Sequence, residues 1–168
     1  MLRRDDPGRR SRPCGAGEPP RACGAGSRTC VEGLADTGAL LAFLDADDKW
    51  HGRCVAAFER LRLPLGTTAA VLAELFHLLG EHAGHVTAAW RLLRSDAITV
   101  LPVVDNDLPA LDGLMRRYAD RPMDFADATL VHAASRTGVN TVFTIDHDDF
   151  LTYRVDRRRR FRIVPDRW

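Results

Sequence analysis

Lysine, cysteine and long apolar stretches are scarce in this chain of 168 residues, and each scarcity limits the classes of protein to which the chain can belong. Lys49 is the only lysine, so arginine carries nearly all of the positive charge. No run approaches the roughly 18 apolar residues that a membrane span requires. No apolar stretch follows Arg9 and Arg10, as it would in an export signal. We therefore expect a cytoplasmic protein that does not contact a membrane.

The four cysteines indicate neither a zinc site nor a disulfide framework. Cys14, Cys23 and Cys30 lie in or beside a segment of low complexity, and Cys54 lies in a helical pattern. Their separations match no CxxC-type zinc motif. In the reducing compartment that we expect, disulfides are rare. Neither type of site is therefore predicted.

The composition predicts one globular domain behind a basic tail. Hydrophobic residues make up 45% of the chain and charged residues 28%, which are ordinary values for a folded protein. Residues 1–29 are rich in Gly, Pro and Arg and have no hydrophobic period, so we predict that this segment is disordered. Residues 30–168 then form one domain of common size.

The formal net charge of +1 hides a marked asymmetry along the chain. Residues 1–30 carry +4 and residues 154–168 carry +5, whereas residues 31–153 carry −8. Basic ends on an acidic body favour a polyanionic partner that approaches a carboxylate-rich centre. The alternative is that the terminal arginines are solvated and have no partner.

Short apolar segments alternate with helical patterns along residues 30–168, which predicts an α/β domain with a mostly parallel sheet. No internal repeat is visible. Functional sites in such sheets form beyond the carboxyl ends of the strands, where Asp36 and Asp146 are each the first acid. The expected strands are 30–35, 63–66, 98–103, 139–145 and 161–164, and the expected helices are 38–44, 47–58, 69–79, 85–94, 108–118 and 125–135.

Four acidic residues lack the neighbours that a solvated carboxylate usually has. Glu74 lies in a nearly apolar helix with no Lys or Arg three or four residues away. Around Asp127 the only charged residue at those spacings is another acid, Asp124. Asp36 is flanked by small and apolar residues, and Asp146 closes the most hydrophobic predicted strand. These four acids are the candidate catalytic and metal-binding residues.

A divalent cation would make such a group of acids tolerable. A buried carboxylate without a partner costs several kcal/mol or takes up a proton, and neighbouring carboxylates repel each other. Oxygen ligands favour Mg²⁺, with Mn²⁺ possible. The alternative is that each acid caps a helix or pairs with an arginine from elsewhere in the fold.

Three further residues are candidates for a supporting role at this site. Asp124 lies one helical turn before Asp127 and is a ligand, a support or a helix cap. Thr144 precedes Asp146 by two residues, so its hydroxyl either orients a ligand or is an ordinary strand side chain. Asp149 follows in a predicted polar loop and could reach the edge of the site, although solvation is the simpler expectation for it and for Asp148. A metal held in this way can activate water and neutralise charge on a phosphodiester.

The sequence resembles the PIN-domain ribonucleases, and within them the VapC-like toxins of toxin–antitoxin pairs. The resemblance rests on four blocks in the family's order, at 35–51, 67–80, 121–139 and 143–150. It implies a PIN-like three-layer α/β/α sandwich and Mg²⁺- or Mn²⁺-dependent cleavage of single-stranded RNA. It also implies a homodimer, and an antitoxin protein that covers the early helices. Carried over by motif, the family's core acids fall on Asp36, Glu74, Asp127 and Asp146.

Two features depart from the family's usual pattern, and other functions remain open. Glu32 and Gly33 interrupt the first strand, and residues 1–29 form an unusually long leading segment.

A housekeeping nuclease in RNA processing, or a PIN-like module that binds RNA or protein without cutting, would share the same fold. The run Asp36-Thr37-Gly38 also occurs in aspartic proteases, but those are β-rich, whereas a helical pattern follows it here.

Overall fold

The computed structural model describes residues 30–121 and 123–167, so the predicted tail 1–29 lies outside the described residues. Five strands form one sheet in the order β3-β2-β1-β4-β7, and every neighbouring pair is parallel. Their parallel direction brings the carboxyl ends to a common edge. The strands are β1 (Gly33–Ala35), β2 (Leu65–Thr68), β3 (Ile98–Leu101), β4 (Thr141–Phe143) and β7 (Arg162–Val164).

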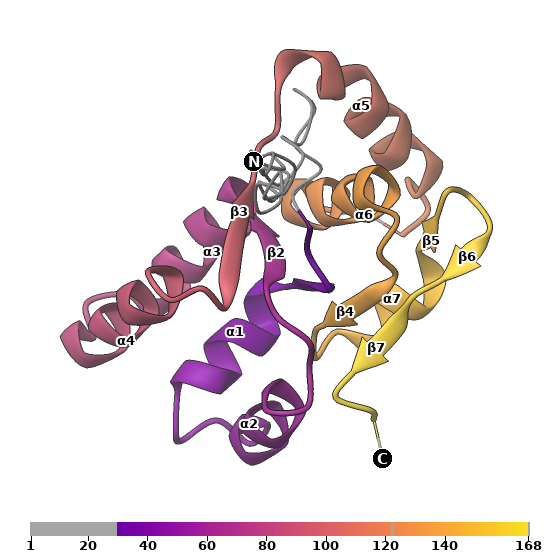
Figure 1. The fold of residues 1–168 in the computed structure, drawn as a ribbon. Coiled ribbons are helices and arrows are strands. Elements are labelled where there is room, and N and C mark those ends of the chain that lie inside the picture. Colours follow the sequence, from indigo (N-terminus) through magenta and orange to yellow (C-terminus); the bar gives the residue numbers. More distant parts are fainter. Residues whose placement is uncertain (1–29, 122, 168) are drawn as a thin grey trace, which may run out of the picture.

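Seven α-helices of the described chain surround this sheet, and the predicted α/β sandwich with a parallel sheet is confirmed. Figure 1 shows α1 and α2 together in one part of the molecule and α5 and α6 together in another, with strands between them. The helices are α1 (Thr37–Leu44), α2 (His51–Phe58), α3 (Ala69–Leu79), α4 (Ala83–Leu93), α5 (Leu108–Arg117), α6 (Phe125–Thr137) and α7 (His147–Thr152), with one 3-10 turn, η1 (Asp105–Asp107).

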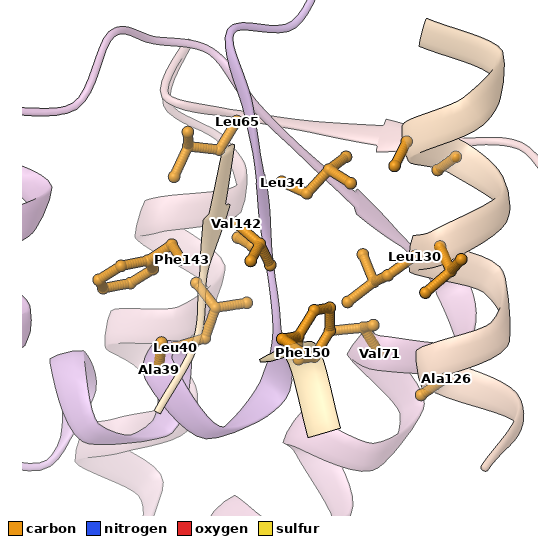
Figure 2. Packing of buried hydrophobic residues seen from close by; sticks show 14 of the residues in the cluster. Leu34, Ala39, Leu40, Leu65, Val71, Ala126, Leu130, Val142, Phe143 and Phe150 are labelled. Atoms are coloured by element: carbon orange, nitrogen blue, oxygen red, sulfur yellow. The ribbon is translucent and has the colours of Figure 1, made fainter. Parts of the chain in front are cut away.

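The core lies on both sides of the sheet because successive strand residues point to opposite faces. Phe143 of β4 contacts the ring of Phe58 in α2, with ring centroids 5.8 Å apart. Figure 2 shows Phe143 and Leu40 on one side of the β1 strand and Leu130 of α6 on the other. Apolar helices on both faces thus hold the short strands in place.

Most predicted elements are confirmed, but the strands are shorter than expected or shifted. Helix α3 begins and ends where the pattern predicts, and Thr68 caps it by accepting a hydrogen bond from the Val71 amide. Strand β2 begins at Leu65 rather than at residue 63. Strand β4 ends at Phe143, so Thr144 and Asp146 follow the strand instead of lying in it. An apolar run shows that a strand is buried but does not mark where its hydrogen bonds stop.

The segment after β4 departs most from the expectation. Residues predicted as a polar loop around Asp148 and Asp149 form helix α7, for which Asp146 is the N-cap. A two-stranded antiparallel hairpin, β5 (Arg154–Val155) with β6 (Arg159–Arg160), follows. The sequence pattern does not predict this hairpin, because its strands are short and rich in arginine rather than apolar.

The cysteines that the structure describes, Cys30 and Cys54, are free thiols, and Cys14 and Cys23 lie outside the described residues. Burial raises the pKa of the Cys54 thiol to about 11, so this side chain behaves as a small apolar group. Within residues 30–121 and 123–167, no helix is long and apolar enough to cross a membrane.

Candidate metal centre

The fold brings the four predicted acids to one open cavity of ≈ 480 Å³. Asp36 caps α1 directly after β1, and Asp146 caps α7 shortly after β4, the neighbouring strand. Asp127 lies in the first turn of α6 and Glu74 in the middle of α3. Residues far apart in the sequence therefore meet at the carboxyl edge of the sheet.

Asp36 is the most enclosed of the four, with 7% of its surface exposed. Its Oδ1 accepts a hydrogen bond from the Thr37 amide at 2.7 Å, and its Oδ2 accepts one from the Thr144 hydroxyl at 2.7 Å. Burial raises its pKa to about 6, against the lowering effect of these two donors, and the charges of Glu74 and Asp146 raise it further. Asp36 therefore ionises less readily than an ordinary carboxyl.

The pKa of Asp127 is raised more strongly than that of Asp36. Burial raises the pKa of Asp127 to about 8, and the charges of Asp36 and Asp124 add to the effect. The phenol of Tyr153 donates a hydrogen bond to Asp127 Oδ2 at 3.0 Å, which counteracts part of the shift. Tyr153 is fully buried, and burial beside Asp127 raises the pKa of its phenol, so it remains a donor.

Glu74 and Asp146 are each oriented by one contact. The Thr37 hydroxyl donates to Glu74 Oε2 at 2.8 Å, linking α1 to α3. The Asp149 amide donates to Asp146 Oδ1 at 3.2 Å as part of the cap of α7. Among the described residues, Glu74 Oε1 and Asp127 Oδ1 have no hydrogen-bond partner. The Asp146 carboxylate also lies close enough to the Asp149 carboxyl to share a hydrogen bond with it. Glu74 and Asp127 thus each keep one oxygen for a ligand.

The three predicted supporting residues also lie at the cavity. Asp124 caps α6, since its Oδ1 accepts the Asp127 amide at 2.7 Å, and it lines the cavity wall. Thr144 holds two acids at once, donating to Asp36 and accepting the Asp146 amide at 2.9 Å. Asp149 lines the cavity, and partial burial, with the charge of Asp146, raises its pKa.

No arginine, lysine or histidine within the described chain forms an ion pair with any of the four acids. Arg167 lines the cavity, but its guanidinium is bound to Asp148 at 3.0 and 3.3 Å. Asp148, expected to be solvated, is exposed but held in this pair. Pairing with arginine, one part of the alternative to a metal site, is therefore wrong for the described residues, whereas its other part, helix capping, holds for Asp36 and Asp146.

The donor set suits a hard divalent cation. The candidate ligands are all carboxylate oxygens, and the charges of neighbouring acids raise the pKa of Asp36 and of Asp127. Among residues 30–121 and 123–167, no three Asp, Glu, His or Cys side chains are already arranged as a metal site. The chemistry of the four carboxylates fits a metal, although their oxygens are not already gathered around one point.

Tyr153 and Thr37 are contacts of the site that the sequence pattern does not reveal. Nothing in the sequence links Tyr153 to Asp127, because they are 26 residues apart and meet only through packing. Thr37 does carry a signal, since a hydroxyl directly after Asp36 starts a helix close to the site. In the sequence it is visible only as part of the Asp36-Thr37-Gly38 run.

Comparisons with known proteins agree with the fold. A family model described as PIN domain matches residues 34–157, a span that includes all four acids. Ribonuclease VapC26 of Mycobacterium tuberculosis is 28% identical over 135 residues, which are 79% of this chain and 99% of that protein. The crystal structure of Mycobacterium tuberculosis VapC20, described as a sarcin-ricin loop cleaving toxin, is similar in fold. Its TM-score is 0.63 at 24% identity, covering 69% of this chain and 91% of that one.

Proposed function

The chain belongs to the PIN-domain family, and from this premise we propose that it is a metal-dependent endoribonuclease that cleaves single-stranded RNA. One observation carries the proposal: four carboxylates from four separate elements line one cavity, and none is neutralised by a basic side chain of the described residues. The relative named as a ribonuclease supports the substrate class. A module that only binds RNA would have no need to keep all four acids.

Asp36, Glu74, Asp127 and Asp146 would hold Mg²⁺, or Mn²⁺ in its place. When bound, the metal supplies a nucleophilic water and neutralises charge on the phosphodiester. Thr144, Thr37 and Tyr153 orient the carboxylates through the hydrogen bonds described above. Because these donors are fixed by the fold, they position the ligands before the substrate arrives.

Asp127 is the acid of this site that most readily keeps its proton in the metal-free protein. With a pKa raised to about 8, this carboxyl is largely protonated at neutral pH in the metal-free protein. Its oxygen can serve as a ligand only after this proton has left. Cation binding and proton release at Asp127 are therefore coupled, and alkaline pH favours assembly of the site.

We also propose that the protein acts as the toxin of a toxin–antitoxin pair and forms a homodimer. The two VapC relatives support the first part, since one of them is described as a toxin. The antitoxin would cover the early helices α1 and α2, where several apolar side chains are only half-buried. These are Leu41, Phe43, Leu44, Val55 and Phe58.

The decisive experiment compares Asp36→Asn with the purified wild-type protein on single-stranded RNA. We expect wild-type cleavage in Mg²⁺ or Mn²⁺ buffer, no cleavage after chelation, and loss of cleavage and of any growth arrest in Asp36→Asn. Asp96→Asn is the matched control, because Asp96 is exposed and lies outside the cavity. Full wild-type cutting by Asp36→Asn would show that the site assignment is wrong.

A second experiment separates a toxin from a housekeeping nuclease. The chain is expressed with and without the product of a small neighbouring upstream gene, and new RNA ends are mapped. A toxin should arrest growth and create new ends only when the neighbour is absent. Cleavage that the neighbour does not change would favour an RNA-processing enzyme instead.

A further inference from the structure

A shallower cavity of ≈ 340 Å³ adjoins the acid-lined one. Glu74 and Asp124 line both cavities, so the two are continuous at these side chains. The other walls of the second cavity are apolar: Ala70, Ala73, Phe125 and Ala126. An apolar cavity thus opens directly beside the carboxylates of the proposed catalytic site.

Phe125 is the large side chain of this cavity. It is the first residue of α6, and 47% of its surface is exposed. Its backbone is held on both sides, because Asp124 caps the helix and Ala126 is buried in the core. The ring pairs with no other aromatic ring among the described residues. The backbone that carries the ring is therefore fixed, while the cavity beside it stays open to a ligand.

The charge of the site limits how an RNA strand can be held there. Among residues 30–121 and 123–167, seven acids line the larger cavity, and the one arginine on its wall is bound to Asp148. Phosphates next to the cleaved bond consequently find carboxylates rather than guanidinium groups. Within the cavity itself, contacts to the bases can add affinity that these acids do not give to the phosphates, because bases in single strands are free to stack on aromatic rings.

We propose that the cavity beside Phe125 takes one nucleobase of the RNA, stacked on the Phe125 ring, next to the phosphodiester held at the acids. The inference rests on the proposed ribonuclease function. Ala70 and Ala73 of α3 line the same cavity and leave room for the base, where longer side chains would fill it. Phe125 is then a positioning residue, because it orients the nucleotide and leaves the chemistry to the acids.

The test measures binding and cleavage of a short fluorescein-labelled RNA that spans the mapped cleavage site. Phe125→Ala should weaken binding by about 5- to 100-fold in the Asp36→Asn background. In the active protein it should raise KM more than it lowers kcat. Phe125→Leu, which keeps an apolar side chain without a ring, should lose affinity while folding normally. Phe125→Trp should restore it. The salt dependence of binding should stay unchanged, since no phosphate contact is lost.

Leu151→Ala is the matched control, because Leu151 is 51% exposed and lines neither cavity. Binding by Phe125→Leu within about twofold of the wild type would overturn the inference and leave the nuclease assignment intact. A change in oligomeric state on light scattering, without a change in KM, would assign Phe125 to a protein interface instead. If the wild-type protein neither binds nor cuts RNA, the proposed function fails together with the inference.

Discussion

Two carboxylates that contact or belong to helix α6, Asp107 in η1 and Asp127 in the first turn of α6, have very different surroundings. Asp107, 9% exposed, receives the Val104 amide at 2.9 Å and the Arg136 guanidinium at 3.0 Å on its Oδ2. His132 Nε2 lies 3.0 Å from its other oxygen. These contacts, led by the Val104 amide, lower the pKa of Asp107. Asp127 receives a phenol and is surrounded by other acids, and its pKa is raised to about 8.

The difference shows that the fold provides basic partners for an enclosed acid outside the proposed metal site. Both basic partners of Asp107 lie on α6, one and a half to two and a half turns after Asp127 by the ordinary helix repeat of about 3.6 residues. Helix α6 thus provides basic side chains for Asp107 in η1 and none for the carboxylate in its first turn. Carboxylates without basic partners lower the stability of the metal-free protein. The same carboxylates remain available as ligands when a metal binds.

Replacing Asp127 has the largest expected effect on activity. Asp127→Asn removes a ligand and should lower the rate of RNA cleavage by about 100-fold or more, because a bound metal supplies several kcal/mol of transition-state stabilisation. The free energy of unfolding without metal should rise at neutral pH, because the amide resembles the protonated carboxyl of the folded state but cannot ionise in the unfolded chain. Single-turnover cleavage and urea unfolding in chelator measure the two effects. Normal RNA cleavage by this variant would show that Asp127 is not needed for the reaction.

Asp107→Asn should show the reverse pattern. It removes a charge that Arg136 and His132 face, so the free energy of unfolding should fall by about 1–3 kcal/mol. The Arg136 side chain is 44% exposed and water compensates part of the loss. Cleavage by the folded fraction should stay close to that of the wild type. Urea unfolding at neutral pH measures the loss of stability, and initial rates measure cleavage. Lost activity in a stable Asp107→Asn protein would contradict the assignment of Asp107 to stability alone.

The two regions should also respond to pH with opposite sign. Folded Asp127 keeps its proton up to about pH 8, whereas an unfolded Asp loses it near 3.8. The folded state therefore binds more protons between these values, and the stability of the metal-free protein falls as pH rises through them. Asp107, with a lowered pKa, stabilises the fold above the unfolded value and loses that contribution on acidification. Urea unfolding across this range in chelator should show a shallower decline for Asp127→Asn than for the wild type, and equal slopes would contradict the assignment.

The elements of the fold were easier to predict from the sequence than the contacts of the site. Helix α3 follows from an uninterrupted helical pattern behind Thr68, because local propensity and packing agree there. Glu32 and Gly33 look like a break in the first strand. Gly33 in fact belongs to β1, and a Cβ at this position would lie 2.9 Å from the Leu65 side chain. A glycine that permits close packing cannot be distinguished from a strand breaker in one sequence.

The acids of the site were predictable because each lacks a local partner, and their assignment as ligands stays a prediction. The cavity shared by Asp36, Glu74, Asp127 and Asp146 agrees with it. The residues that orient these acids were harder to find. Tyr153 follows helix α7, which is short and polar and has the sequence pattern of a loop. Without that helix, nothing places its phenol beside Asp127.

The smallest effect is expected from Thr144→Val, which changes how two acids are held without removing either. The fully buried Thr144 hydroxyl donates to Asp36 and accepts the Asp146 amide, and valine has nearly the same shape but makes neither bond. The pKa of Asp36 should rise above its value of about 6, because a donor that lowers it is lost. Apparent Mg²⁺ affinity, taken from cleavage rates against metal concentration, should fall by about 10-fold. Excess Mg²⁺ or a more alkaline buffer should recover most of the rate, and Thr144→Ser should behave like the wild type. A purely structural role for Thr144 predicts the opposite: a loss that neither metal nor pH repairs, because the fraction of folded enzyme would be what had changed.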